Sequence, residues 1–190
     1  MKRLFVTVII SALGLLSILL MEISVCKLTY NENLEESKEI LKVAYDIVNS
    51  PENEESSLLN EEDIIGVLKI NKLNVEAPIK EGTSQQIMKT SIGHFSESDY
   101  WNGNVSFASH NSGTSAHYFE KINTLNSNDE IEYITKFGTK KYKVESIKKI
   151  DSTDWSMVEK SDDKSKNTVT LITCINGQPD YRLCVRGVEI

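Results

Sequence analysis

The sequence holds few of the residues on which disulfide-rich or zinc-stabilised domains depend. Only three cysteines occur, at positions 26, 174 and 184, and no two of them form a CxxC pair. There are also only three histidines, and no cysteine or histidine cluster has the spacing of zinc ligands. We therefore expect neither a disulfide framework nor a structural zinc site. A single cysteine with a distant histidine remains a possible nucleophile arrangement.

Positive charge is also in short supply. The formal net charge is -7, and residues 31–63 carry eleven acids against two lysines. Residues 64–190 carry sixteen acids and sixteen bases, so the acidity belongs to one segment. No basic stripe with interleaved aromatic residues is present, and nucleic acid is therefore not an expected partner. The length of 190 residues suits one compact domain with short extra segments.

A long uncharged apolar run lies at the N-terminus. Leu4–Met21 has no charged residue and directly follows Lys2 and Arg3. Eighteen helical residues span about 27 Å, close to the thickness of a bilayer's hydrocarbon core. We therefore expect residues 1–27 to form a cytoplasmic tip and a transmembrane anchor. The positive-inside rule then places the N-terminus in the cytoplasm and the rest of the chain outside.

The alternative to an anchor is a cleaved signal peptide. Such peptides usually have a shorter apolar region followed by a small-x-small cleavage site. Ser24-Val25-Cys26 is a poor match to that site. The sequence therefore favours an uncleaved anchor.

Residues 28–62 are predicted to form an acidic linker or stalk. Apolar residues recur with helical spacing over Glu32–Val48, and Pro51 and the run Glu52–Ser57 then break the pattern. The high charge indicates a segment that is partly helical and strongly solvated. A regulatory flap that covers a functional site is the alternative interpretation.

After residue 63, apolar and polar residues alternate, as is typical of β-strands. Ser84 is expected to cap a short helix through Lys89, and Ala116–Leu125 is expected to form another. About eight short strands separated by Gly and Asn turns predict a closed or nearly closed β-barrel over residues 63–190. The segments that carry this pattern are Ile64–Ile70, Leu73–Lys80, Asn104–Ser109, Asp129–Phe137, Lys140–Ile150, Thr168–Thr173 and Arg182–Ile190.

Three short segments together resemble the sortase family of cysteine transpeptidases. Thr170–Cys174 (TLITC) is similar to the family's TLxTC signature, and Arg182 leads a final strand eight residues later. Ala108-Ser109-His110 is similar to the family's A-G-H segment at the end of a strand. The resemblance covers residues 64–190. It implies a mainly β fold, a closed eight-stranded barrel with short helices, here preceded by the transmembrane helix.

Other segments indicate the branch of the family and two departures from it. Gly93–Phe95 and Thr153–Ser156 look like class D. Ser109 stands where the family usually has glycine, and Ile175–Tyr181 is a short connection before the arginine. The acidic residues that bind calcium in some class A members have no clear counterparts just before His110. No metal and no cofactor are therefore expected.

The resemblance implies a catalytic set of Cys174, His110 and Arg182. A thiolate attacks carbonyl groups well near neutral pH and forms a thioester that is open to amines. His110 would act as general acid and base, and Arg182 would donate hydrogen bonds to the oxyanion. His94, as a loop residue, and His117, at the start of a helix, are the competing histidines.

Less specific interpretations accompany each of these residues. A cysteine at a strand end is by default a small buried hydrophobe, which suits Cys184 in the last strand. Arg182 competes with Arg186, since either could be a strand-edge surface arginine. Thr173 precedes the nucleophile, and with Ser109 and Asn111 it is a candidate for substrate binding.

The resemblance also implies the substrates. The donor would be a secreted protein with an LPxTG-like sorting signal, cleaved between Thr and Gly. The acceptor would be an amine on a peptidoglycan precursor or on a pilin or other surface protein of a Gram-positive bacterium. Two alternatives use the same fold: a hydrolase that releases the cleaved chain to water, and a non-catalytic, membrane-tethered binding module.

Overall fold

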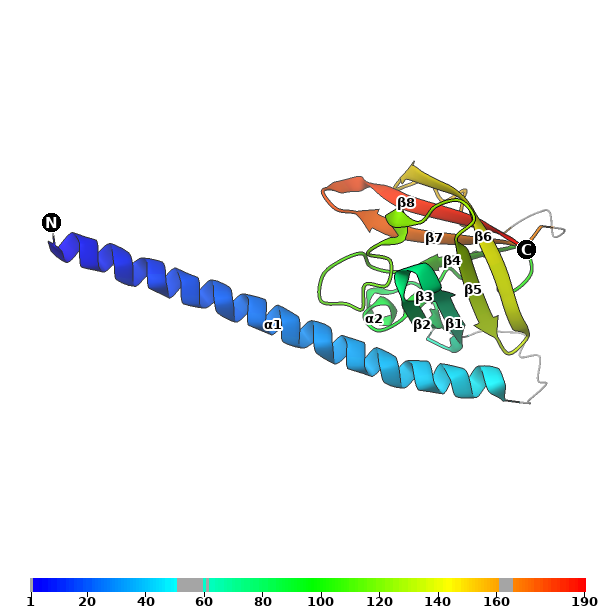
Figure 1. The fold of residues 1–190 in the computed structure, drawn as a ribbon, viewed down its shortest axis with the longest axis horizontal. Coiled ribbons are helices and arrows are strands. Elements are labelled where there is room, and N and C mark those ends of the chain that lie inside the picture. The colour runs from blue at the N-terminus through cyan, green and yellow to red at the C-terminus, as the bar shows by residue number, and fades with distance from the viewer. Residues whose placement is uncertain (1, 51–59, 61, 161–165) are drawn as a thin grey trace.

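The protein folds into a closed β-barrel with one long helix beside it (Figure 1). A computed structural model describes residues 2–50, 60, 62–160 and 166–190. The strands confirm the predicted mainly β, eight-stranded barrel. They are β1 (Ile64–Ile70), β2 (Val75–Glu81), β3 (Ile92–His94), β4 (Asn104–Ala108), β5 (Glu130–Thr135), β6 (Gly138–Asp151), β7 (Thr168–Ile175) and β8 (Gln178–Glu189).

The order of the strands brings three distant segments to one end of the barrel. Around the barrel the order is β1-β2-β3-β4-β7-β8-β6-β5, and β5 closes onto β1. β4 and β7 are parallel, with Ala108 opposite Ile172, so both strands finish at the same end. β8 is antiparallel to β7 and starts there. We call this the hairpin end, after the β7–β8 turn, where Gly177 has a φ of +74°.

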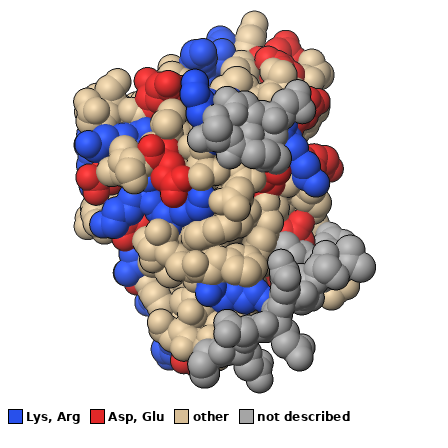
Figure 2. Space-filling model, turned by 90° about the vertical axis from the view of Figure 1, so that its right-hand side faces the viewer, with Lys and Arg blue, Asp and Glu red and all other residues tan. Residues whose placement is uncertain are grey.

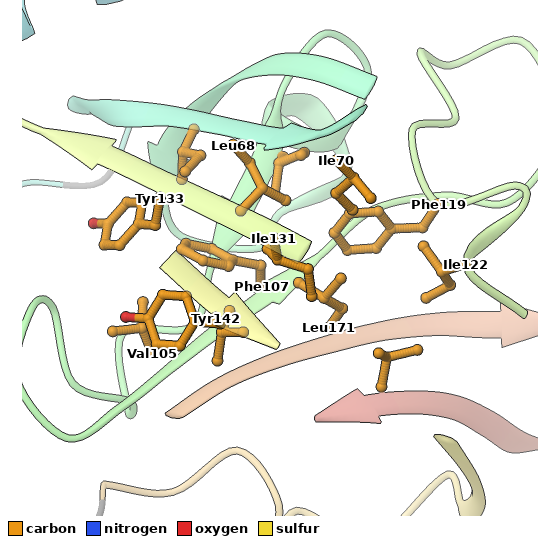
Figure 3. Close-up of a cluster of buried hydrophobic side chains, with 14 of the residues drawn as sticks. Leu68, Ile70, Val105, Phe107, Phe119, Ile122, Ile131, Tyr133, Tyr142 and Leu171 are labelled. Carbon is orange, nitrogen blue, oxygen red and sulfur yellow. The ribbon is translucent and has the colours of Figure 1, made fainter. Parts of the chain in front are cut away.

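Side chains fill the interior of the barrel, so it holds no internal channel for a substrate. Figure 3 shows aromatic and aliphatic residues from β1, β4, β5, β6 and β7 packed together. The rings of Phe107 and Tyr133 meet edge to face with centroids 5.1 Å apart. Successive side chains of a strand point to opposite faces of the sheet, so every second residue faces the interior. In β5, Ile131, Tyr133 and Thr135 are buried while their neighbours are more exposed. Functional groups therefore lie outside this packed interior, at the ends of the barrel or on its outer face.

The strand that is hardest to see in the sequence is β3, which is three residues long. It pairs in parallel with β2 and antiparallel with β4. Its last residue is His94, which is buried, and not the loop residue that we expected. The His94 ring lies 2.6 Å from Glu81 Oε2 and 3.0 Å from Ser98 Oγ. These bonds give His94 a structural role.

The two predicted short helices have different outcomes. α2 (Gln85–Met88) forms, and the hydroxyl of Ser84 caps it by accepting a hydrogen bond from the amide of Ile87. The prediction of a helix over Ala116–Leu125 is wrong, since only the 3-10 turn η2 (Ile122–Thr124) is regular. Tertiary bonds replace the helical ones there. The amide of Ala116 donates to the carbonyl of Lys89, and that of Phe119 to His110.

The burial pattern explains why this segment is not helical. Its apolar residues are buried at a spacing of three and not of 3.6 residues: Ala116, Phe119, Ile122 and Leu125. A spacing of three suits a tight 3-10 turn and an extended, core-pinned chain. The buried residues therefore follow a period that differs from that of the predicted α-helix.

The N-terminal quarter of the chain is one continuous helix, α1 (Lys2–Asn49). It runs without a break through both the predicted anchor and the helical part of the predicted linker. Residues 10–49 include a window that is long and apolar enough to cross a membrane, judged by length and composition. The large apolar side chains from Ile10 to Leu28 are all more than half exposed, and this part of α1 extends away from the barrel (Figure 1). The charged run Glu52–Ser57 lies outside the described residues.

The C-terminal third of α1 packs on the barrel, which differs from the solvated stalk expected for residues 28–62. Ser37 and Ala44 are almost completely buried, and the helix contacts β1 and β2. Because these residues are small and seven positions apart, they let one face of the helix approach the strands closely. Tyr45 extends this contact by donating a hydrogen bond to Glu76 of β2. The other face keeps the exposed acids that make the segment look solvated.

Candidate active site

Cys174 lies at the hairpin end of β7 with its side chain exposed. The other cysteines are placed differently. Cys26 is exposed on α1, and Cys184 is buried in a small cluster with Ile172 and Val158. Burial raises the pKa of the Cys184 thiol to about 11, so that this thiol stays protonated. Cys184 is a core residue, as expected, and Cys174 has the accessibility that a nucleophile needs.

Arg182 lies directly across from Cys174 in the β7–β8 pair. Side chains of residues opposite each other in an antiparallel pair project from the same face of the sheet. The connection predicted as a short loop is mostly strand, with an irregularity in β8 where Ile175 pairs with Gln178. Arg182 Nη1 donates to the carbonyls of Pro179 and Tyr181, both at 2.8 Å. These bonds hold the guanidinium at the base of the hairpin, and its other N–H groups are donors of the kind that an oxyanion requires.

Arg186, the competing arginine, lies deeper along the strand. It is opposite Thr170, and its Nη2 donates to Thr168 Oγ1 at 3.2 Å. Arg186 therefore lies four residues further along β8 than Arg182, the residue opposite the exposed thiol. The geometry favours Arg182 for a role beside Cys174.

His110 follows β4 by two residues and is half-buried at the hairpin end. Two hydrogen bonds tie the segment around it to the end of β7. Thr173 Oγ1 donates to the carbonyl of Ser109 at 2.7 Å, and Asn111 Nδ2 donates to the carbonyl of Cys174 at 2.6 Å. The first bond involves Ser109, the residue before His110, and the second involves Asn111, the residue after it. The structure thus brings the three predicted catalytic residues to one end of the barrel, from β4, β7 and β8.

The candidate substrate-binding residues separate into two groups. Thr173 and Ser109 are 4% and 3% exposed, and they bond to each other across the ends of the two strands. This arrangement supports a positioning role for both. The hydroxyl of Ser109 is buried without a hydrogen-bond partner among the described residues. Asn111 is more accessible and stays a candidate for substrate contact.

The protonation of His110 is perturbed by its surroundings. Burial lowers the pKa of the His110 imidazole, and the nearby His117 lowers it further. Both causes act in the same direction, because desolvation and a neighbouring positive charge each disfavour the imidazolium form. At neutral pH the ring is therefore mostly neutral, ready to accept a proton.

Replacing His117 with glutamine is expected to raise the pKa of His110 while leaving it below its usual range. The substitution removes the repulsion from the His117 imidazolium, and the effect of burial remains. The chain has three histidines, so a proton NMR titration of their ring signals can follow each one. Lys121→Gln, which removes an exposed positive charge from the same segment, is the matched control. An unchanged or lowered His110 pKa in the His117 variant would contradict the assignment.

A pocket lies at the end of the barrel opposite to Cys174, and Figure 2 views the molecule from that end. It has a volume of about 1030 Å³, and Glu81, His94 and Asp99 are among its lining residues. Figure 2 shows side chains of both charges intermixed on this face. No group of three potential metal ligands occurs among the described residues. Because it lies at the other end of the barrel, this pocket is remote from Cys174. Its lining residues Glu81, His94 and Ser98 are hydrogen-bonded to one another.

Sequence reasoning missed several residues that support the site. Tyr30, Asn33 and Ser37 of α1 contact the segment that follows His110, although the linker was expected to stand apart from the barrel. The available signal was the spacing of three and four residues between them, which continues to Ala44. Since two of the three are polar, the pattern did not read as a buried face.

Comparison with known proteins shows which family the chain and its fold resemble. The family described as Sortase domain matches residues 68–190. Sortase D of Bacillus subtilis (strain 168) is 28% identical over 111 residues, a match that covers 57% of this chain and 53% of that protein. The matched region thus spans about half the length of this curated relative.

Two solved structures from Clostridium perfringens are similar over most of their length. The sortase D5 transpeptidase is 25% identical with a TM-score of 0.64, covering 85% of this chain and 98% of that chain. Sortase C, solved with the C-terminal cell wall sorting motif, is 26% identical with a TM-score of 0.64, covering 85% and 88%.

Proposed function

The chain belongs to the sortase family, and we propose that it is a membrane-anchored cysteine transpeptidase. Its donor substrate is a secreted protein with an LPxTG-like sorting signal, and its acceptor is an amine on a peptidoglycan precursor or a surface protein. The observation that carries this proposal is the pairing of the exposed Cys174 with Arg182 across β7 and β8, beside His110. The sorting motif present in the structure of the Clostridium perfringens sortase C supports the substrate class.

The first half-reaction uses Cys174 as nucleophile. The neutral imidazole of His110 takes the proton of the Cys174 thiol, and the resulting thiolate sulfur attacks the carbonyl carbon of the Thr–Gly bond. The negative charge moves to the carbonyl oxygen. Arg182 donates hydrogen bonds to this oxyanion, because a fixed cationic donor is worth most where charge develops. The carbon–nitrogen bond then breaks, the imidazolium of His110 gives its proton to the departing glycine nitrogen, and the acyl group stays on the sulfur as a thioester.

The second half-reaction returns the enzyme to its starting state. An acceptor amine attacks the thioester carbonyl and gives its proton to the neutral imidazole of His110. The carbon–sulfur bond breaks, which releases the new amide, and the imidazolium returns its proton to the sulfur, so that the thiol and the neutral imidazole are restored. The lowered pKa of His110 favours this step, since a neutral ring is ready to accept the proton.

The orientation of α1 supports action at the membrane surface. The helix leaves the barrel at its hairpin end, and its N-terminal half continues outward on that side (Figure 1). With Leu4–Met21 in the bilayer and Lys2 and Arg3 in the cytoplasm, the barrel lies outside the cell with its active-site end toward the membrane. Tethered donors and acceptors would then meet the site at a raised effective concentration.

A ligation assay on the full-length chain in detergent micelles tests the proposed function. An LPxTG-like peptide is incubated with the protein and with triglycine as the amine, and the products are followed by mass spectrometry. We expect cleavage between Thr and Gly and a new peptide joined to triglycine. Cleavage without ligation at saturating amine would instead indicate a hydrolase. If no cleavage occurs and Cys174 does not react with a methanethiosulfonate reagent, the binding-module alternative is favoured.

A further inference from the structure

The segment that carries His110 away from β4 lacks regular secondary structure until the turn η2. Within the barrel it is held by a few backbone bonds, among them Phe119 N to the carbonyl of His110 at 3.2 Å and Ala116 N to that of Lys89 at 2.8 Å. A segment of this kind keeps one conformation only if other contacts offset the entropy lost on ordering it. We refer to residues 110–119 as the histidine loop.

Three residues of α1, each about one helical turn from the next, contact the histidine loop. Asn33 Nδ2 donates to the carbonyl of Thr114 at 2.7 Å. Ser37 Oγ is hydrogen-bonded to the Tyr118 hydroxyl, and Ser37 is 1% exposed. These contacts join residues 81 positions apart in the chain. They therefore belong to the tertiary structure and not to the local folding of the loop.

The third contact reaches a residue that acts on the catalytic imidazole. The ring of Tyr30 lies over that of His117 with centroids 4.8 Å apart and an interplanar angle of 30°. His117 Nδ1 lies 2.9 Å from the carbonyl of Ser115, which also fixes the ring. Because His117 influences the charge of His110, its position affects the proton transfer as well as the shape of the loop. α1 thus contacts the loop at Thr114, His117 and Tyr118.

We propose that the segment Tyr30–Ser37 of α1 positions the histidine loop, and through it the imidazole of His110, for catalysis. The proposal rests on the proposed function, and it makes these helix residues positioning residues that touch no substrate. The membrane anchor and the active site are then parts of one rigid element, because the helix that leaves the barrel toward the bilayer also braces the loop. The alternative is that α1 only tethers the barrel.

Conservative substitutions in the full-length chain distinguish a positioning role of α1 from a role as a tether only. Asn33→Asp keeps the shape of the side chain but removes the donor to Thr114 and places a negative charge against its carbonyl. Ser37→Ala removes the hydroxyl that bonds to Tyr118. Asn31→Asp is the matched control, since it adds the same charge to an exposed position two residues from Asn33. All variants are compared in the same micelles, with thermal unfolding confirming that the barrel is folded.

We expect kcat for ligation to fall about tenfold in Asn33→Asp and in the double variant Asn33→Asp/Ser37→Ala, with KM nearly unchanged, since a misplaced catalytic group slows the chemical step. The rate at which a methanethiosulfonate reagent labels Cys174 should stay as in the parent protein. The His110 pKa, measured by NMR titration, should rise as His117 moves away. In Asn31→Asp all three quantities should be unchanged.

Two results would overturn the proposal. One is an Asn33→Asp variant whose kcat and His110 pKa both match those of Asn31→Asp. The other is a fall in kcat in Asn33→Asp that is accompanied by a lower unfolding temperature while the His110 pKa is unchanged. That result would indicate that the contact only stabilises the fold. The titration needs no turnover. A His110 pKa that shifts in a protein without ligase activity would refute the proposed function and leave the positioning role intact.

Discussion

Cys174→Ala is expected to abolish cleavage and ligation of an LPxTG-like peptide without unfolding the barrel. The side chain is exposed at the end of β7, so its loss leaves no cavity and should change the free energy of unfolding by less than about 0.5 kcal/mol. The chemistry, in contrast, loses the atom that forms the thioester. Mass spectrometry of the products and a thermal unfolding curve measure the two effects side by side.

The two other cysteines serve as controls for this prediction. Cys26→Ala alters an exposed residue of α1, and we expect the parent rate. Cys184→Ala removes a buried sulfur from the cluster that includes Ile172, so it should lower the unfolding midpoint while activity persists. Retained cleavage in the Cys174 variant, or its loss in the Cys184 variant at a temperature where the barrel is folded, would refute the assignment of the nucleophile.

Arg182→Ala is expected to lower kcat by roughly 10²–10³, the usual effect of removing one oxyanion donor. The interaction forms fully only when negative charge develops, so kcat and kcat/KM should fall together. Arg182→Lys should recover part of the rate only. Lysine keeps the charge, but its donors lack the planar fork that now reaches the carbonyls of Pro179 and Tyr181. Steady-state kinetics with a fluorogenic peptide provide the measurement.

Arg186→Lys is the matched control, since the same substitution is made four residues further along β8. Arg186 bonds to Thr168 and lies opposite Thr170, away from the thiol. We expect its kcat to stay near the parent value, with any effect confined to stability. Equal kcat values for Arg182→Lys and Arg186→Lys would remove Arg182 from the proposed oxyanion site.

Much of the site was visible in the sequence because it is carried by contiguous residues at strand ends. The TLITC segment, the histidine two residues beyond a strand and the arginine in the last strand are each local patterns. Their family assignment is confirmed by the match over residues 68–190. Their catalytic roles stay predictions, which the cysteine and arginine variants test. Ser109 illustrates the limit, because a serine before the histidine looked available to substrate and is in fact buried.

The errors in the fold share one cause, which is that tertiary contacts override local periodicity. The residues from Ala116 to Leu125 were predicted as helix, but the amides of Ala116 and Phe119 donate to the carbonyls of Lys89 and His110, outside the segment. His94 was expected in a loop because β3 is too short to show alternation. In both cases the sequence indicated which residues are apolar, and the partner segments decided the backbone conformation.

Composition and spacing alone predicted the mainly β barrel and the long apolar N-terminal segment, and the motif residues carried the resemblance to the sortase family. These features are local, because strand alternation, a continuous apolar run and a short motif each involve residues that are close together in the chain. Tertiary structure alone decided that β4 runs parallel to β7, that Cys174 lies opposite Arg182, and that α1 contacts the histidine loop. These contacts join segments far apart in the chain, and a segment's pattern shows which face is buried but not which partner buries it.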